Sequence, residues 1–276
     1  MGTHYLVATP IGNLEDITLR AIRLLREVSL IAAEDTRHTG LLLRHLGIAT
    51  PLVSYHAHNE RARRPQLLAH LAGGDLALVS DAGTPGLSDP GHALVVAAVA
   101  AGHQVVPVPG PSALLAAVTA SGLAPDGFTY LGFLPRKPAE ARRALARVAA
   151  LPHPLVIFEA PHRLVETLAL LGEALGERPA VAARELTKLH EEFRRDTLAG
   201  LLAHYRQAPP RGEFVLVVGG APPAAPVGPD EALALLQQAV AAGRSPSQAA
   251  REVAERTGRP RQELYRLLRD HASPAT

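Results

Sequence analysis

The sequence predicts an α/β protein with two α/β domains and a small C-terminal helical domain. Three observations lead to this prediction. Over the first hundred residues, short apolar runs rich in β-forming residues alternate with amphipathic helical stretches. A second, less regular alternation extends to about residue 218. A segment rich in proline and glycine then precedes three short helical stretches.

The regular alternation near the N-terminus defines the first domain, which we assign to residues 1–113. Strands that alternate with helices are typical of a largely parallel sheet covered by helices. We expect strands over 5–8, 30–33, 52–55, 76–79 and 105–108. We expect helices over 17–28, 39–46, 60–72 and 93–101, and a further one over 112–121.

The less regular alternation predicts a second α/β domain with a mixed sheet, assigned to residues 114–220. Its expected strands are 128–131, 155–158, 180–184, 191–197 and 214–218, with helices over 139–149, 163–175 and 198–207. Residues 221–229 have the composition of a linker. Residues 230–276 then form a helical tail whose pattern resembles a helix-turn-helix.

Composition excludes several classes of protein and site. The chain of 276 residues has no cysteine, so disulfides, zinc–thiolate sites, iron–sulfur clusters and cysteine nucleophiles are excluded. Thirteen histidines are scattered, and we expect no metal site. The longest apolar run, 93–101, has nine residues, against the roughly 20 that a membrane-spanning helix needs. With no signal peptide visible at the start, we expect a soluble cytoplasmic protein.

Polar or glycine-rich residues follow each of the five strands expected in the first domain. These segments are 9–16, 34–37, 56–60, 80–91 and 109–112. The carboxyl ends of parallel strands meet at one edge of a sheet, where ligands of α/β proteins bind. The sequence therefore predicts a functional cleft at this edge.

The loop 80–91, Ser-Asp-Ala-Gly-Thr-Pro-Gly-Leu-Ser-Asp-Pro-Gly, is expected to form one wall of that cleft. It has no basic residue and two aspartates, which disfavour a phosphate ligand. The chain also lacks the G-x-G-x-x-G, G-x-x-x-x-G-K-[ST] and G-x-S-x-G motifs. A cationic or zwitterionic ligand fits better, and S-adenosylmethionine has these properties.

Seven segments of the chain occur in the order found in a known family. They are Thr-Pro-Ile-Gly-Asn-Leu at 9–14, Glu-Asp-Thr-Arg at 34–37, Tyr-His-Ala-His-Asn-Glu at 55–60, the loop 80–91, Pro-Gly-Pro-Ser-Ala at 109–113, Gly-Phe-Leu-Pro-Arg-Lys at 132–137 and Arg-Glu-Leu-Thr-Lys at 184–188. Through them the chain resembles the ribosomal RNA small subunit methyltransferase I family. That family belongs to the tetrapyrrole methylase superfamily, also called class III methyltransferases. The resemblance covers about residues 4–219.

This resemblance implies S-adenosylmethionine-dependent methylation of the ribose 2′-oxygen of a decoding-centre cytidine in 16S rRNA. It also implies two α/β domains with the cofactor in the cleft between them, and a homodimer. The implied cofactor contacts from the first domain are Pro10, Ile11, Asp81, Ala82, Gly83, Thr84, Leu87, Ser112 and Ala113. Those from the second domain are Phe158, Glu159, Ala183, Arg184, Glu213 and Phe214.

A ribose hydroxyl is a poor nucleophile and benefits from a general base. The catalytic candidates are Glu34, Asp35, Glu185 and Lys188. Lys188 could act as the base if burial lowered its pKa. For each of the four, the alternative is a structural ion pair.

The formal net charge is only +2, so any RNA contact must be local. Candidate phosphate contacts are Arg61, Arg63, Arg64, Arg136, Lys137, Arg142, Arg143 and the arginines of the tail. Two alternatives stay open. One is a C-methyltransferase acting on a precorrin-type tetrapyrrole, and the other is a non-catalytic RNA-binding assembly protein.

Overall fold

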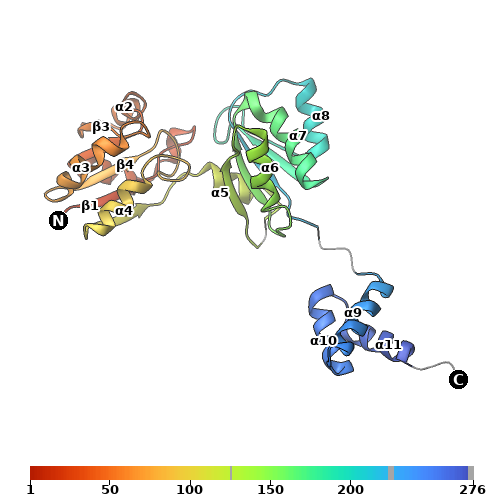
Figure 1. Cartoon of the computed structure of the whole chain (residues 1–276). Coiled ribbons are helices and arrows are strands. Elements are labelled where there is room, and N and C mark those ends of the chain that lie inside the picture. The colour runs from red at the N-terminus through yellow and green to blue at the C-terminus, as the bar shows by residue number, and fades with distance from the viewer. Residues whose placement is uncertain (125, 223–226, 273–276) are drawn as a thin grey trace. The chain divides into compact units, whose positions relative to one another are not determined.

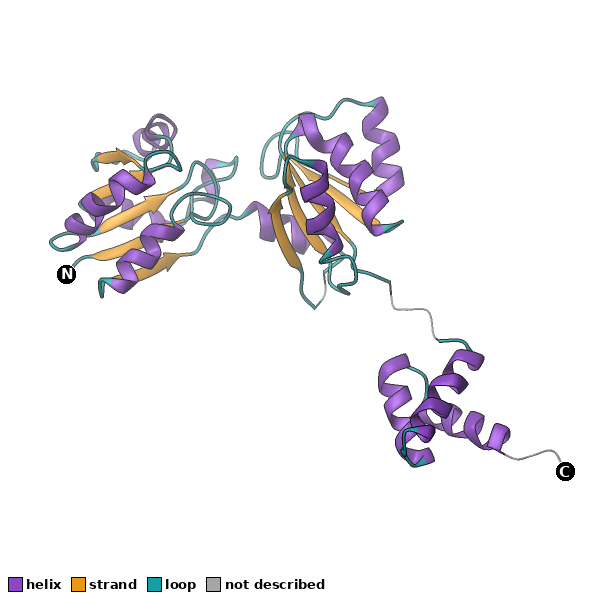
Figure 2. Ribbon diagram, in the orientation of Figure 1, coloured by secondary structure: helices purple, strands orange, loops and turns teal. Residues whose placement is uncertain are grey.

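The computed structural model describes residues 1–124, 126–222 and 227–272, and the chain forms two compact units. The first unit, Met1–Ala221, contains two five-stranded sheets, and the second, Pro222–Thr276, is helical (Figures 1 and 2). The α/β class and the helical C-terminal region predicted from the sequence are confirmed. The predicted linker 221–229 includes residues 223–226, which lie outside the described residues.

The first sheet has the strand order β3-β2-β4-β1-β5, and all its strand pairs are parallel. Its strands are β1 (Thr3–Val7), β2 (Leu30–Ala33), β3 (Leu52–Ser54), β4 (Leu76–Val79) and β5 (Gln104–Val108). The connections contain the short 3-10 helix η1 (Leu14–Asp16), α1 (Leu19–Glu27), α2 (Thr36–His45), α3 (Glu60–Leu71) and α4 (His92–Ala100). Because the strands are parallel, all five polar segments that follow them lie at one edge, as predicted.

Helices cover both faces of this sheet, and β4 supplies a buried side chain to each face in turn. Ala77 and Val79 pack with the α1 and α2 side of the sheet, whereas Leu76 and Leu78 pack with the α3 and α4 side. This alternation follows the two-residue period of a strand. All four residues of β4 are buried, which explains why the strand reads as a continuous apolar run.

The second sheet has the order β6-β7-β10-β8-β9 and is mixed, as predicted. Only β6 and β7 pair in parallel. The strands are β6 (Thr129–Phe133), β7 (Leu155–Glu159), β8 (Pro179–Arg184), β9 (Glu192–Thr197) and β10 (Phe214–Val218). The helices are α5 (Ala113–Ser121), α6 (Pro138–Ala146), the short 3-10 helix η2 (Pro161–Arg163), α7 (Leu164–Leu175) and α8 (Leu198–Gln207).

The two faces of the second sheet have different partners. Helices α6, α7 and α8 cover one face with leucine-rich packing. The other face packs against α5 and also against Ile11 and Leu87, which come from loops of the first sheet. This shared cluster holds the loops of both sheets together at the site described below.

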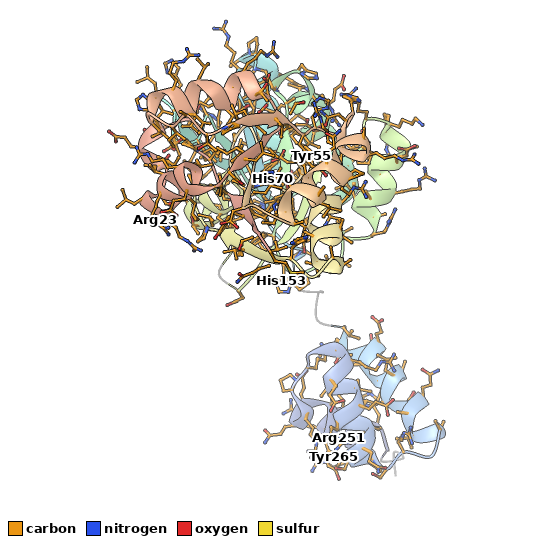
Figure 3. The ribbon with its side chains drawn as sticks, turned by 90° about the vertical axis from the view of Figure 1, so that its left-hand side faces the viewer. Arg23, Tyr55, His70, His153, Arg251 and Tyr265 are labelled. Atoms are coloured by element: carbon orange, nitrogen blue, oxygen red, sulfur yellow. The ribbon has the colours of Figure 1, made fainter. Side chains whose placement is uncertain are left out.

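The C-terminal unit is a three-helix cluster made of α9 (Pro229–Ala241), α10 (Pro246–Thr257) and α11 (Arg261–Ala272). Leu236, Val253 and Leu264 are fully buried at its centre. Helix α10 begins at a capping box formed by Ser245 and Gln248. Arg251 and Tyr265 are among the side chains that project from this unit (Figure 3).

Element boundaries differ from the predicted ones by a few residues. Helix α2 begins at Thr36 rather than at residue 39, because the Asp35 side chain caps it by accepting a hydrogen bond from the Arg37 N–H. Strand β6 runs two residues beyond its predicted end, through a β-bulge. Within the described residues, no helix has the length and apolar character needed to span a membrane.

Candidate active site

A cavity of about 530 Å³ lies where loops of the first sheet face β7, β10 and the ends of β6 and β8. Its volume falls in the range of about 300–1,000 Å³ that is typical of small-molecule sites. Most of the predicted cofactor contacts line it, namely Ile11, Asp81, Ala82, Gly83, Thr84, Leu87, Ser112, Ala113, Phe158, Glu159 and Glu213. Of the four catalytic candidates, Glu34 lines it.

Other predicted site residues lie outside the lining of the cavity. They are Pro10, Ala183, Arg184, Asp35, Glu185 and Lys188. Ala183 is buried in the sheet beside Val215, and Arg184 pairs with Glu192 at 3.3 Å. Phe214, a further predicted contact, lines the cavity as well, whereas the prediction omitted Ser88, Asp89, Phe133, Ala160, Pro161, Leu186 and Val215.

The loop between β4 and α4 is fixed to the first sheet by its backbone. Gly83 and Thr9 exchange two hydrogen bonds, of 2.9 Å and 3.0 Å, and the Thr9 hydroxyl donates to the Ser80 carbonyl oxygen. Gly83 has φ +78°, a conformation that glycine adopts without strain. Ser88 also has a positive φ, of +66°, and its hydroxyl hydrogen-bonds the Tyr130 hydroxyl at 2.6 Å. The loop is therefore held by both sheets.

Three carboxyl groups from the first sheet line the cavity together. Burial, the nearby carboxylate of Glu34 and that of Asp81 raise the pKa of Asp89 to about 6. Burial and Asp81 also raise the pKa of Glu34. Asp81 accepts a hydrogen bond from the Asp35 N–H at 2.9 Å. The three carboxyl groups give the cavity wall a negative potential. Burial and their mutual repulsion make Glu34 and Asp89 weaker acids than free carboxyls.

Asp35 has a structural role in this geometry. Its carboxylate caps α2 and forms two hydrogen bonds with the Arg37 guanidinium, at 3.1 Å and 2.7 Å. These bonds hold the pKa of Asp35 well below its usual range. Asp35 therefore fits the ion-pair alternative, and a carboxylate held in this way is a poor proton acceptor.

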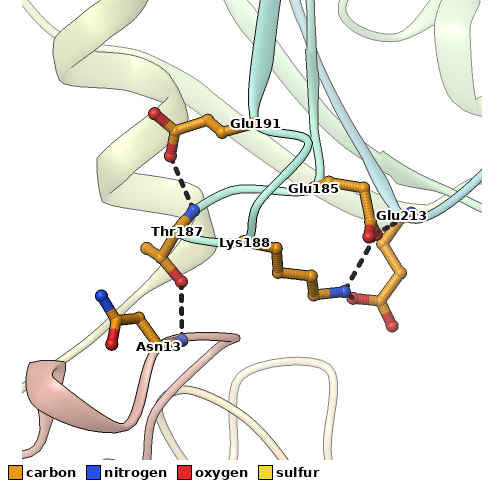
Figure 4. Close-up of polar contacts among 6 residues, drawn as sticks. All are labelled: Asn13, Glu185, Thr187, Lys188, Glu191 and Glu213. Atoms are coloured by element: carbon orange, nitrogen blue, oxygen red, sulfur yellow. Dashed lines mark hydrogen bonds and ion pairs between the residues drawn. The ribbon is translucent and has the colours of Figure 1, made fainter.

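Glu185 and Lys188 form an ion network on the loop between β8 and β9 (Figure 4). The Lys188 ammonium lies 2.9 Å from both Glu185 Oε1 and Glu213 Oε2. Burial lowers the pKa of Lys188, but its bonds to Glu213 and Glu185 outweigh burial and raise it. The condition under which Lys188 could act as the base, a pKa lowered by burial, is therefore not met, because the two glutamates stabilise the charged form.

The same loop contacts the first sheet. The Thr187 hydroxyl accepts a hydrogen bond from the Asn13 N–H at 3.1 Å, and the Thr187 N–H donates to Glu191 at 2.6 Å (Figure 4). Glu185 and Thr187 have φ values of +50° and +66°, which are unusual for residues with a Cβ. Backbone strain of this kind concentrates at functional sites.

The wall from the second sheet combines a buried carboxylate with aromatic rings. Glu159 accepts hydrogen bonds from the Thr167 hydroxyl at 2.6 Å and the Ala160 N–H at 2.8 Å. The ring of Phe158 packs edge-to-face with those of Tyr130 and Phe133. Among the described residues that line the cavity, none is lysine, arginine or histidine. The cavity therefore suits a ligand with positive charge and an apolar part.

Comparison with known proteins agrees with this geometry. Residues 3–202 match the family model described as "Tetrapyrrole (Corrin/Porphyrin) Methylases". Residues 226–270 match the one described as "RsmI C-terminal HTH domain". The protein named "Ribosomal RNA small subunit methyltransferase I" of Synechocystis sp. is 51% identical over 271 residues, which cover 97% of each chain. The protein of the same name from Micromonospora olivasterospora is 50% identical over 97% of this chain and 87% of its own.

A solved structure shares the fold of the first unit. The uroporphyrin-III C-methyl transferase from Thermus thermophilus, complexed with S-adenyl homocysteine, matches with a TM-score of 0.57 and 24% identity. The match covers 79% of this chain and 97% of that one. The chain therefore belongs to the tetrapyrrole methylase family of S-adenosylmethionine-dependent methyltransferases.

Proposed function

We propose that this methyltransferase transfers the methyl group of S-adenosylmethionine to the ribose 2′-oxygen of a decoding-centre cytidine in 16S rRNA. The observation that carries the proposal is the acidic cavity, which is lined by residues of six of the seven family-like segments, in a chain whose relatives are named for small-subunit ribosomal RNA. Five carboxyl groups line this cavity, those of Glu34, Asp81, Asp89, Glu159 and Glu213.

The residues present fit S-adenosylmethionine. The backbone of residues 82–84 and the N-terminal end of α5, capped by Ser112, would hold its polar groups, while Ile11, Leu87 and Phe158 offer apolar contacts. The carboxyl groups complement a sulfonium and an ammonium charge. When bound, the cofactor supplies the methyl group on a positively charged sulfur and leaves as S-adenosylhomocysteine.

We assign the general base to Glu34. Of the four catalytic candidates it is the one that lines the cavity, and its raised pKa makes it a better proton acceptor than Asp35. Its carboxylate would accept the proton of the ribose 2′-hydroxyl as that oxygen attacks the methyl carbon. The ion network around Lys188 instead positions the loop between β8 and β9, since Lys188 holds its proton firmly.

The ribosomal RNA substrate is supported by the C-terminal unit as well. Over 244–271 it has seven arginines against four acidic residues, a balance of +3. Along α11, Arg261, Tyr265 and Arg269 are exposed and lie four residues apart, so they share one face. Arginines next to an aromatic ring suit contacts to phosphates and bases.

Charge reversal in the full chain tests this role of α11. A variant with Arg261 and Arg269 changed to glutamate should lose affinity for small ribosomal subunits and keep its affinity for S-adenosylhomocysteine. Unchanged affinity for the subunits would exclude the helix as an RNA contact.

The proposed reaction is tested by radiolabelled methyl transfer to small ribosomal subunits isolated from a strain that lacks this methyltransferase. Label in the ribose of 16S rRNA supports the proposal. Label only in an added tetrapyrrole would support a C-methyltransferase. Cofactor binding without transfer to either would support a non-catalytic RNA-binding protein.

The proposal includes a cytoplasmic location, where small subunits are assembled, and a homodimer. Light scattering of the purified chain at micromolar concentration should then give a mass twice that of one chain. A mass equal to one chain would remove the dimer from the proposal without affecting the chemistry.

A further inference from the structure

Strand β6 contains an irregularity that changes the direction of Phe133. Its pairing with β7 shifts register between Tyr130 and Gly132, and Gly132 has φ +63°. In a regular strand, residues three apart point to opposite faces. Here Tyr130 and Phe133 both contact the ring of Phe158, with centroids 5.2 Å and 5.8 Å away. Leu131 and Leu134 pack with the cluster on the other face.

The bulge therefore moves Phe133 from the apolar core to the cavity. Bulges next to active sites commonly redirect a side chain in this way. Of the aromatic residues that line the cavity, Phe214 is buried and Phe158 is partly buried, whereas Phe133 is 54% exposed. The exposed face of the Phe133 ring is apolar surface in contact with water. A ligand that covered the ring would remove this surface from water and gain binding free energy.

The residues after Phe133 are held in place and carry positive charge. The Arg163 guanidinium donates to the carbonyl oxygens of Leu134 and Pro135, at 3.0 Å and 3.4 Å. Arg136 and Lys137 follow directly and are exposed. Among the described residues Lys137 pairs weakly with Glu140, at 3.3 Å, and Arg136 has no ion pair. An exposed aromatic ring that lines the acidic cavity is thus followed within four residues by two exposed cations that do not line it.

We propose that Phe133 is the stacking platform for the base of the nucleotide whose ribose enters the cavity. This inference rests on the proposed RNA methylation and adds to it how the substrate is held. A ribose inside a folded RNA reaches an enclosed site when its nucleotide leaves the base stack. The extruded base then needs a new stacking partner. A phenyl ring accepts any base, so Phe133 positions the nucleotide, while recognition of its sequence lies elsewhere.

The test compares Phe133→Ala, Phe133→Leu and Phe133→Trp with the wild type. Phe128→Ala is the matched control, because Phe128 is also an exposed aromatic residue, precedes the same strand and does not line the cavity. Two affinities are measured without turnover: that for S-adenosylhomocysteine, and that of the S-adenosylhomocysteine-loaded enzyme for unmethylated small ribosomal subunits. The KM and kcat for methyl transfer to the subunits are measured separately.

Loss of one stacked base should weaken binding of the subunits roughly 5- to 150-fold in Phe133→Ala. Phe133→Leu should behave like the alanine variant, because it keeps apolar volume without a ring face, and Phe133→Trp should retain binding. The KM for the subunits should rise in Phe133→Ala and Phe133→Leu and stay near the wild-type value in Phe133→Trp. The affinity of all three variants for S-adenosylhomocysteine should stay within about twofold of the wild type.

Two results would overturn the platform. Weaker S-adenosylhomocysteine binding with unchanged subunit binding would mean that the ring holds the cofactor. Unchanged subunit binding in both Phe133→Ala and Phe133→Leu would mean that it holds no base. A wild-type chain that binds subunits but transfers no methyl group would defeat the proposed reaction, whereas the ratio of variant to wild-type binding would still decide the platform.

Discussion

The two sheets of the first unit contribute to one cavity in different ways. In the parallel sheet every strand ends at the same edge, so segments that directly follow strands meet there by topology. In the mixed sheet all neighbouring strands except β6 and β7 run in opposite directions, so site residues come from strand ends, a bulge and a strained turn. The first sheet supplies Glu34, Asp81 and Asp89, whereas the second supplies Phe133, Phe158 and Glu159.

The two sheets therefore differ in the role that their residues have in the cavity. The carboxyls of the first sheet are close to one another and have raised pKa values at Glu34 and Asp89, which suits proton transfer and a cationic ligand. The carboxylate of Glu159 in the second sheet is buried, accepts hydrogen bonds from the Thr167 hydroxyl and the Ala160 N–H, and lies 3.7 Å from the Arg163 guanidinium. We infer that the first sheet carries the chemistry and the second sheet holds the ligands in position.

The largest effect should come from Glu34→Gln. Removing a general base slows the chemical step by about 10²- to 10⁴-fold, while the affinity for S-adenosylhomocysteine should change little. Single-turnover kinetics together with calorimetry measure the two quantities.

Asp35→Asn is the control for this variant. Asparagine still caps α2, so the rate should stay close to that of the wild type. If Glu34→Gln retained full activity, or if both variants lost it equally, the base would not be Glu34.

Thr167→Val should have the next largest effect, on stability. It keeps the shape of the side chain but removes the donor to the buried Glu159 carboxylate, which costs about 1–3 kcal/mol. Urea unfolding followed by circular dichroism measures the change. Thr119→Val, on the exposed side of α5, is the control and should fall within about 0.5 kcal/mol of the wild type. Equal effects of the two variants would argue against a special role for Glu159.

The smallest effect should be the pH dependence of Asp89→Asn. Folding raises the pKa of Asp89 from its ordinary value of 3.8 to about 6, so the folded state binds this proton more tightly than the unfolded state. The charged carboxylate, which faces Glu34 and Asp81, therefore destabilises the folded protein above pH 6, and this penalty disappears as the pH falls from about 6 to 4.

Asp89→Asn should consequently raise the Tm at pH 8 by on the order of 2 °C. The gain should shrink at pH 5 and be almost absent at about pH 3.5, below the pKa of the unfolded group. Calorimetry at constant ionic strength checks these values, and a gain of the same size at about pH 3.5 would show that ionisation of Asp89 is not its cause.

Sequence reasoning predicted the first sheet and the meeting of its strand-end segments at one edge, because strand ends and loops are adjacent in the chain. It did not identify Phe133 as a lining residue, because only the register shift at Gly132 turns that ring toward the cavity. Asp89 lay in the loop that the sequence singled out, but its raised pKa depends on Glu34, a neighbour far away in the chain. The raised pKa of Lys188 could not be predicted from the sequence, because one of its two partners, Glu213, comes from a distant part of the chain.

The central claim is methyl transfer to a ribose oxygen of ribosomal RNA. The most direct measurement is to incubate the wild-type chain with labelled S-adenosylmethionine and unmethylated small subunits, digest the 16S rRNA to nucleosides and separate them. The label should appear in 2′-O-methylcytidine, and Glu34→Gln should slow its appearance by about 10²- to 10⁴-fold. Label in a methylated base, or no label in RNA from a chain that binds S-adenosylhomocysteine, would contradict the account.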